Sequence, residues 1–337
     1  MSVLSAQQNA PAPSVDTTKS GQRADIYQNV GQVERLDPAF DALIAQPAQI
    51  EKLCEGFNWS EGPVWKDGAV LFSDVPENVI YQWKQGETKA SVFLKPSGMT
   101  KPTPGFREQG SNGLALDAKG NLIVCQHGDR RIARFLGDNK FETIAGEFEG
   151  KRFSSPNDLA IRSNGDIYFT DPPYGLEKLN DSPLKEIPFN GVYRVTPDGK
   201  VSLLTKEISF PNGIAFSPDE KVLYVANSKE LHVRAYDVQP DGSITNSRIF
   251  FDASQLRAPG RKGSCDGLKT DSQGNVWTTG PGGVLVINPE GKHLGSILTG
   301  EATGNCAWGD DGSTLYMTAD MFLCRIKTKV TGAGWKK

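Results

Sequence analysis

Six residues with carboxylate or amide side chains hold the same place in six similar stretches of the chain. Each stretch continues with a short apolar run, a turn rich in Asp, Asn and Gly, and a β-rich strand, as in PNDLAIRSNGDIYFTD from Pro156. We call these six the ring residues: Glu61, Asn112, Asn157, Asn212, Asp266 and Asn305. Carboxylate and amide oxygens without thiolates or imidazoles favour a hard cation such as Ca²⁺ or Mg²⁺. Such a cation could act as a Lewis acid on a carbonyl or phosphoryl oxygen, or it could only hold parts of the fold together.

The spacing of the ring residues predicts that they stand on repeated structural units. Successive ring residues are 51, 45, 55, 54 and 39 positions apart, and a unit contains as many as four β-rich segments. Strands joined by a short Asp/Asn/Gly turn form antiparallel hairpins. We therefore predict an all-β fold, a six-bladed β-propeller with four-stranded antiparallel blades and an N-terminal extension. In such a ring, residues that lead into the innermost strands converge at the mouth of the central channel.

We divide the chain into an N-terminal tail with a short helix, 1–47, and a propeller domain, 48–330. The polar composition of residues 1 to about 25 predicts a disordered tail. The sixth unit runs out after its third strand, so AQIEKLCEGF, from Ala48, is expected to supply the fourth. This pairing would close the ring, because an open ring leaves strand edges unpaired.

The short helix is expected in ERLDPAFDALI, residues 34–44. Leu36, Phe40 and Leu43 recur there at helical spacing, which predicts one apolar face. Its expected role is packing against the propeller.

The composition of the chain argues against nucleic acids and membranes as partners. The net charge of −3 gives no sign of a nucleic-acid-binding surface, and no apolar stretch approaches the roughly 18 residues of a membrane-spanning helix. The five cysteines form no CxxC pair, and the three histidines show no i, i+4 spacing. The N-terminus lacks the pattern of a signal peptide. We expect a cytoplasmic monomer or homodimer with a small-molecule substrate, and the periplasm as the alternative location.

Several motifs, taken in order, resemble the SMP-30/gluconolactonase/LRE-like family. They are EGPVW, SPNDLAI, FTDPPYG, PNGIAFS and CDGLKTDSQGNVW, and the resemblance covers about residues 50–328. The stretches HGDRR and DPPYG place the chain nearer the bacterial gluconolactonase-type branch. The resemblance implies a six-bladed propeller that hydrolyses sugar lactones with a divalent cation in its channel. That cation is usually Ca²⁺, with Mg²⁺, Zn²⁺, Mn²⁺ and Fe²⁺ as alternatives.

The family's metal ligands can be carried over onto matching positions. The metal-binding Glu falls on Glu61, its Asn ligands on Asn157 and Asn212, and its acidic ligand on Asp266. One position departs from the pattern: some members have a substrate-contacting Arg where this chain has Ser155. The substrate preference of those members therefore does not transfer.

Further residues are expected to contact the substrate. Asn157 would do so besides binding the metal, and Asn112 and Asn305 occupy the matching places in two other blades, where they would contact or support the substrate site. His127 and Arg131 lie in CQHGDRR, after the second strand of their unit. A fourth set of contacts is expected from Tyr174 in the proline-stiffened TDPPYG loop. For His127 and Arg131, hydrogen bonds or ion pairs within the fold are the alternative.

Asp266 is the predicted catalytic residue. It could orient or deprotonate the attacking water, or it could attack the carbonyl itself and form an anhydride. The sequence leaves both routes open. Two other functions also remain: hydrolysis of another lactone or a phosphotriester at the same site, and non-catalytic ligand binding by the propeller.

Overall fold

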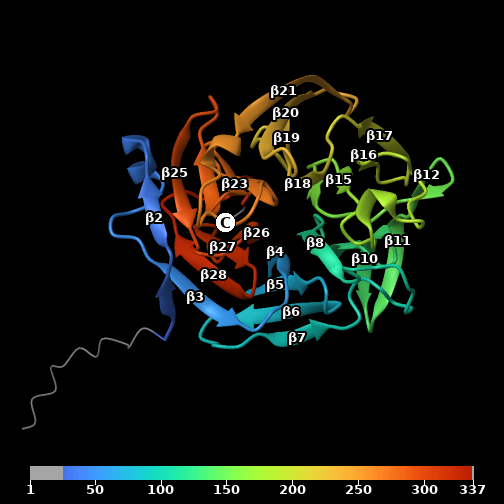
Figure 1. Cartoon of the computed structure of the whole chain (residues 1–337), viewed down its shortest axis with the longest axis horizontal. Coiled ribbons are helices and arrows are strands. Elements are labelled where there is room, and N and C mark those ends of the chain that lie inside the picture. Colours follow the sequence, from blue (N-terminus) through green and yellow to red (C-terminus); the bar gives the residue numbers. More distant parts are fainter. Residues whose placement is uncertain (1–25, 336–337) are drawn as a thin grey trace, which may run out of the picture.

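The computed structural model describes residues 26–335, and these form a six-bladed β-propeller (Figure 1). The blades follow one another around the ring in chain order, from blue through green and yellow to red in the figure. Each blade is an antiparallel sheet with its first strand innermost. The predicted all-β, six-bladed architecture is confirmed.

The strand bounds show how each ring residue is placed. The innermost strands are β4 (Ser60–Lys66), β8 (Ser111–Leu116), β14 (Leu159–Ile161), β18 (Pro211–Phe216), β22 (Leu268–Thr270) and β26 (Thr303–Gly309). The first blade continues with β5 (Ala69–Asp74), β6 (Val79–Lys84) and β7 (Ser91–Leu94), and the second with β9 (Leu122–Gln126), β10 (Arg131–Gly137) and β11 (Lys140–Ala145). The third continues with β15 (Ile167–Asp171), β16 (Gly191–Val195) and β17 (Val201–Thr205), and the fourth with β19 (Val222–Asn227), β20 (His232–Val238) and β21 (Ile244–Asp252). The fifth continues with β23 (Val276–Gly280), β24 (Gly283–Ile287) and β25 (His293–Leu298), and the sixth with β27 (Thr314–Ala319), β28 (Phe322–Lys327) and β3 (Ile50–Glu55). Every ring residue lies at the start of its innermost strand or within two residues of it.

The ring closes between the two ends of the chain, as predicted. Strand β3 pairs with β28, with Leu323 opposite Cys54, and so supplies the fourth strand of the sixth blade. The hairpin β12 (Glu147–Phe148) and β13 (Lys151–Arg152) and the 3-10 helices η2 (Leu179–Asp181) and η3 (Ser254–Leu256) lie in connections between these strands.

The N-terminal extension differs from the prediction of a tail and short helix. Strand β1 (Gln28–Val30) pairs with β3 and β2 (Gln32–Arg35) pairs with β25, so each adds a fifth strand to a blade. Both strands are too short for a period to show in the sequence. The predicted tail, residues 1–25, lies outside the described residues.

The predicted helix is present only as one short turn. The 3-10 helix η1 (Pro38–Ala42) begins after Asp37, whose side chain accepts a hydrogen bond from Ala39 N. Phe40 and Leu43 are buried, but Leu36 is 53% exposed, because the chain leaves β2 at that point and helical spacing does not apply.

The apolar core lies between neighbouring blades and under the N-terminal extension. One cluster joins the fifth and sixth blades around Trp277 and Trp308, whose ring centroids are 5.1 Å apart, and includes Phe40 of η1. Within residues 26–335, no helix is long and apolar enough to cross a membrane.

Candidate active site

Five of the six ring residues line one cavity of about 420 Å³ at one end of the central channel. We call it the central cavity. Its wall is formed by Asn58, Trp59, Glu61, Pro76, Arg107, Glu108, Asn112, Asn157, Tyr174, Asn212, Ser228, Ser264 and Asp266. The structure thus brings the four predicted metal ligands, and three of the predicted substrate-contacting residues, to a single surface.

Glycines beside the ring residues allow the blades to approach closely at the cavity floor. A Cβ on Gly213 would lie 2.2 Å from the backbone oxygen of Asp266, and the Gly213 N–H donates to that oxygen at 3.1 Å. Gly62 has a φ of +50°, and an added Cβ would lie 2.0 Å from the backbone oxygen of Asn112. Because no side chain fits there, the motif Glu/Asn/Asp followed by Gly is a packing requirement of the ring.

The Glu61 carboxylate is fixed by its own strand and by the sixth blade. Its Oε2 accepts a hydrogen bond of 2.8 Å from Gly62 N, and a Cβ on Gly304 would lie 2.6 Å from its Oε1. Burial raises the pKa of Glu61, and the nearby Asp158 carboxylate raises it further. A contact from the Asn305 amide acts in the opposite direction.

Asn212 and Asp266 present unpaired oxygens. Asn212 Nδ2 donates to Ser228 Oγ at 2.9 Å, and Asp266 N donates to Thr279 Oγ1 at 2.9 Å. Among the described residues, Asn212 Oδ1, Asp266 Oδ1 and Asn112 Oδ1 are buried and have no hydrogen-bond partner. Burial raises the pKa of Asp266 well above its usual range, and the Glu61 carboxylate contributes next. Buried oxygens without donors are costly unless a ligand satisfies them.

Carboxylates outnumber cations around the central cavity. Four carboxylates lie in the cavity wall or directly beneath it: Glu61, Glu108, Asp158 and Asp266. Arg107 pairs with Glu108 at 2.7 Å, and Lys269 Nζ lies 3.9 Å from Asp158 Oδ2. When all four carboxylates are ionised, the two cations leave two negative charges unbalanced, which one divalent ion would balance.

The donor set also fits a hard divalent ion. Among the described residues, no three His, Cys, Asp or Glu side chains gather closely enough to hold a metal by themselves. Amide oxygens must therefore complete any such set. The unpaired oxygen of Asn212 is available for it, and Asn157 lines the same cavity. Carboxylate and amide oxygens without sulfur or imidazole are the ligands of Ca²⁺ and Mg²⁺.

Three residues predicted to contact substrate lie away from the cavity wall. His127 is fully buried behind Glu108, with Nδ1 4.0 Å from Glu108 Oε2, and burial lowers its pKa to about 3. Arg131 lines a separate cavity and is held by Gln126 Oε1 at 2.7 Å and Asp129 Oδ2 at 2.9 Å. Asn305 is buried beneath the wall, and its Nδ2 donates to Asp158 Oδ2 at 3.3 Å. The structure thus places these three side chains outside the wall of the central cavity.

Ser155, where some relatives have Arg, holds a loop of the cavity wall. Its hydroxyl donates to Pro172 O at 2.7 Å and accepts from Gly175 N at 2.9 Å. Gly175 O in turn accepts from Arg107 N at 3.0 Å. A serine here therefore fixes the Tyr174 loop and, through it, the segment that carries Arg107.

Trp59, Arg107 and Glu108 were missed in the sequence. Arg107 and Glu108 lie in the long connection between β7 and β8, which carries no repeated motif. The length of that connection was the one available signal, since long ordered loops often carry functional residues. Trp59 directly precedes β4, and its side chain lines the cavity.

The fold and the site define a β-propeller with an acidic, oxygen-lined pocket on its axis. The chain matches the SMP-30/gluconolactonase/LRE-like region over residues 59–320, and it belongs to that family.

Individual relatives agree with this assignment. A gluconolactonase of Zymomonas mobilis is 38% identical over 94% of this chain and 92% of its own length. The regucalcin of Oryctolagus cuniculus is 26% identical over 79% of this chain and 84% of its own. A solved gluconolactonase structure from Xanthomonas campestris superposes with a TM-score of 0.76 at 29% identity, covering 90% of this chain and 97% of the other. The family predicted from the motifs is confirmed.

Proposed function

We propose that the protein is a lactonase that hydrolyses a sugar lactone in the central cavity with the help of a divalent cation. The likeness to gluconolactonases over nearly the whole chain supports the reaction class. The observation that carries the cation is the pair of buried, unpaired oxygens on Asn212 and Asp266, in a cavity where carboxylates outnumber cations.

Glu61, Asn157, Asn212 and Asp266 would hold the ion, which we propose to be Ca²⁺. A set of two carboxylates and two neutral amides suits this ion, because Ca²⁺ tolerates six to eight oxygen ligands in flexible geometry and can also accept water and substrate oxygens. When bound, it would polarise the lactone carbonyl and stabilise the negative charge that develops on its oxygen.

Asp266 would act on the attacking water. Its unpaired Oδ1 is an acceptor for a water proton. The water oxygen joins the carbonyl carbon, the ring C–O bond breaks, and a proton reaches the departing ring oxygen. The products are the open-chain hydroxy carboxylate and a proton.

The remaining wall residues would position the sugar ring. Trp59 and Tyr174 offer aromatic surfaces, against which the C–H faces of a sugar pack well. Asn112 Oδ1 and the Tyr174 hydroxyl are suited to hydrogen bonds with ring hydroxyl groups. Arg107 is held by Glu108 at the rim, so the wall offers little free positive charge to an anionic sugar.

The test is hydrolysis of glucono-1,5-lactone, followed by acid release and corrected for the spontaneous rate. The enzyme is measured as purified, after EDTA treatment, and after Ca²⁺ or Mg²⁺ is restored. We expect activity that EDTA removes and a divalent ion restores. Activity that ignores EDTA would overturn the role of the cation, and no activity on a panel of aldonolactones would overturn the lactonase proposal.

A further inference from the structure

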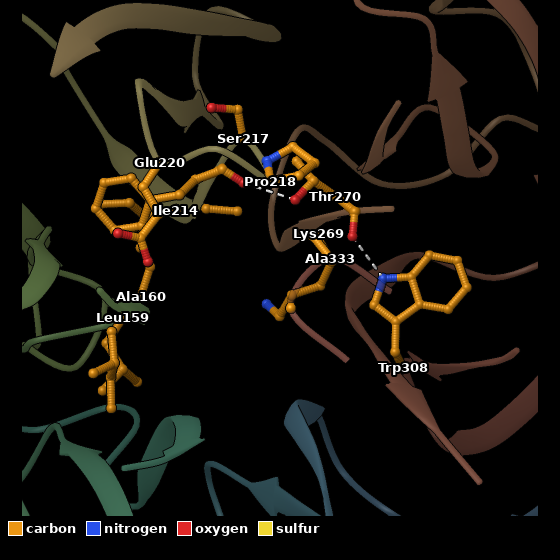
Figure 2. Close-up of a pocket in the computed structure, with 14 residues that line it drawn as sticks. Leu159, Ala160, Ile214, Ser217, Pro218, Glu220, Lys269, Thr270, Trp308 and Ala333 are labelled. Carbon is orange, nitrogen blue, oxygen red and sulfur yellow. Dashed lines mark hydrogen bonds between the residues drawn. The ribbon is translucent and has the colours of Figure 1, made fainter. Parts of the chain in front are cut away.

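A second cavity lies at the other end of the central channel. The far cavity has a volume of about 260 Å³ and is lined by the later residues of the innermost strands, including Ile214, Phe216 and Trp308. Figure 2 shows the Lys269 side chain extending into the middle of this space, near the dashed bond between Trp308 Nε1 and Thr270 O. The far cavity is mostly apolar, so a lysine there needs an explanation.

Lys269 is an exception within the repeat. It stands three positions after its ring residue, Asp266, on an innermost strand. The corresponding residues of the other blades are Val64, Ala115, Ala160, Ala215 and Trp308. Five of six blades thus have an apolar side chain here, and the fifth blade alone in this repeat has a charge.

Asp158 is a second exception, and it meets the first. It follows its ring residue, Asn157, where four other blades have a glycine. Its carboxylate is 2% exposed on the propeller axis, with Oδ2 lying 3.9 Å from Lys269 Nζ and Oδ1 accepting from Leu159 N at 2.8 Å. A Cβ on Gly113 would lie 2.8 Å from Asp158 Oδ1, so a neighbouring glycine makes room for this carboxylate.

The Asn305 amide connects this pair to the central cavity. Its Oδ1 accepts from Cys306 N at 2.8 Å and from Lys269 Nζ at 3.5 Å, while its Nδ2 donates to Asp158 Oδ2 at 3.3 Å. These partners determine which end of the amide carries the oxygen. The residue before Asn305, Gly304, lies against the Glu61 carboxylate, since a Cβ on it would be 2.6 Å from Glu61 Oε1, and the nearby Asn305 amide lowers the pKa of Glu61. Polar contacts therefore connect Lys269 to Asn305, whose strand lies against the predicted metal ligand Glu61.

We propose that Lys269 is a positioning residue for the acidic site of the central cavity. Together with Asp158 it holds the Asn305 amide with its nitrogen toward Glu61, and Asn305 then fixes the Glu61 carboxylate. Residues that orient ligands from behind commonly change metal affinity by roughly 10- to 100-fold when they are lost. The inference rests on the proposed function only in taking the central cavity to bind a divalent ion.

The direction in which Lys269→Met changes the affinity for a divalent ion distinguishes a positioning role from simpler roles. If Lys269 acted only through its charge, Lys269→Met would remove a repelling cation and tighten binding of a divalent ion. If it served only the fold, the variant would unfold at a lower temperature and bind the ion as before. Positioning predicts the opposite of the charge effect: we expect binding roughly tenfold weaker in spite of the lost repulsion.

The experiment measures Ca²⁺ binding by calorimetry for the full chain and for Lys269→Met. Lys327→Met is the matched control, because Lys327 Nζ also pairs with a carboxylate, Asp310 Oδ2 at 2.9 Å, but on the outer part of the sixth blade. We expect weaker binding in Lys269→Met and unchanged binding in Lys327→Met. Unchanged or tighter binding in Lys269→Met overturns the proposal.

A chemical rescue tests the ammonium group itself. The Lys269 side chain is 26% exposed and borders the far cavity, so a small reagent can reach Lys269→Cys, whereas the native cysteines of the described chain are buried. Aminoethyl methanethiosulfonate rebuilds an ammonium on that thiol, and methyl methanethiosulfonate adds a neutral group. We expect only the first to restore ion affinity, with the treated native protein as control. Equal rescue by both reagents contradicts the proposal.

A crystal structure of Lys269→Met keeps the two proposals distinguishable. If the native protein binds no divalent ion, the proposed function fails, but the positions of Asn305 and Glu61 still decide the role of Lys269. Displacement of both side chains supports positioning. If both remain in place, Lys269 does not position them.

Discussion

Asn212 Nδ2 donates a hydrogen bond of 2.9 Å to Ser228 Oγ, and this contact determines which end of the Asn212 amide is free. The amide oxygen is left buried without a partner in the wall of the central cavity, as the described residues show. Ser228 thus orients a predicted metal ligand that comes from the same blade, with Asn212 on β18 and Ser228 just after β19.

Removal of the Ser228 hydroxyl should weaken ion binding. In Ser228→Ala the Asn212 amide can rotate, so part of the population presents its NH₂ group to the ion. We expect a Ca²⁺ dissociation constant roughly three to ten times larger by calorimetry. Ser243→Ala, which removes an exposed hydroxyl that bonds Asp241 in the same blade, is the control. An unchanged constant in Ser228→Ala would show that the bond does not orient the ligand.

The raised pKa values of Glu61 and Asp266 predict how stability depends on pH. Without a divalent ion, the folded protein keeps these two carboxyl groups protonated at pH values above the usual carboxyl pKa. The unfolded chain has lost the same protons at those pH values. Stability contributed by the protonated acids is therefore lost as the pH rises above that range. A bound divalent ion replaces those protons, so its stabilising effect should grow with pH.

Thermal unfolding at about pH 5 and about pH 8 measures this effect. After EDTA treatment, we expect a lower midpoint at the higher pH. The increase in midpoint on adding Ca²⁺ should be larger at pH 8 than at pH 5. Equal increases at both pH values would mean that the ion does not compete with protons in the cavity.

The architecture and most of the site could be read from the sequence because the repeat exposes them. Each ring residue recurs before an apolar strand, and the glycine after four of them reflects close packing between blades. Such local rules act within one unit, so one sequence shows them several times. They predicted the blades, the closure by β3, and the meeting of Glu61 and Asp266 in one cavity.

What the sequence could not show depends on how different connections pack together. Arg107 reaches the cavity because its backbone N–H donates a hydrogen bond to Gly175 O. No sequence pattern around either residue predicts that contact. His127 lies on the predicted loop but points into the protein. Strand β2 pairs with β25, which lies near the other end of the chain, and no local pattern encodes that pairing.

Gly62 should tolerate no side chain, for reasons beyond its backbone conformation. Gly62 and Gly68 both have positive φ, of +50° and +77°, but an added Cβ at Gly68 meets nothing within 4 Å. Gly68→Ala should therefore cost about 1 kcal/mol, which is the conformational penalty alone. Gly62→Ala should cost about 2 kcal/mol more, because its Cβ would force β4 away from Asn112 O. Urea unfolding compares the two, and equal losses would show that the ring relaxes freely at this point.

His127 should be replaceable by an apolar residue. Neither ring nitrogen has a hydrogen-bond partner among the described residues, and the lowered pKa keeps the ring neutral near pH 7. Exchange of an unsatisfied buried polar group for an apolar one of similar size is close to neutral in stability. We expect His127→Leu to keep its unfolding free energy within about 1 kcal/mol and to keep the pH profile of lactone hydrolysis. A shifted pH profile of hydrolysis would show that His127 takes part in the reaction.

Asp266→Asn should separate ion binding from catalysis. The amide keeps an oxygen for the ion but cannot accept a proton, so we expect a modest loss of Ca²⁺ affinity and a fall in kcat of roughly 100-fold or more. Asp311→Asn, a change at an exposed turn of the sixth blade, is the control. Unchanged turnover in Asp266→Asn would remove Asp266 from the mechanism.

A single turnover in ¹⁸O-labelled water then decides how Asp266 acts. If the carboxylate activates water, the first product molecule carries the solvent label. If Asp266 Oδ1 attacks the carbonyl and forms an anhydride, water that opens the anhydride at the Asp266 carbon leaves unlabelled oxygen in the product and the label on the enzyme. The unpaired Oδ1 beside Asn212 leads us to expect label in the product and none on Asp266 by mass spectrometry. Label on the Asp266 peptide would replace the general-base route with the covalent one.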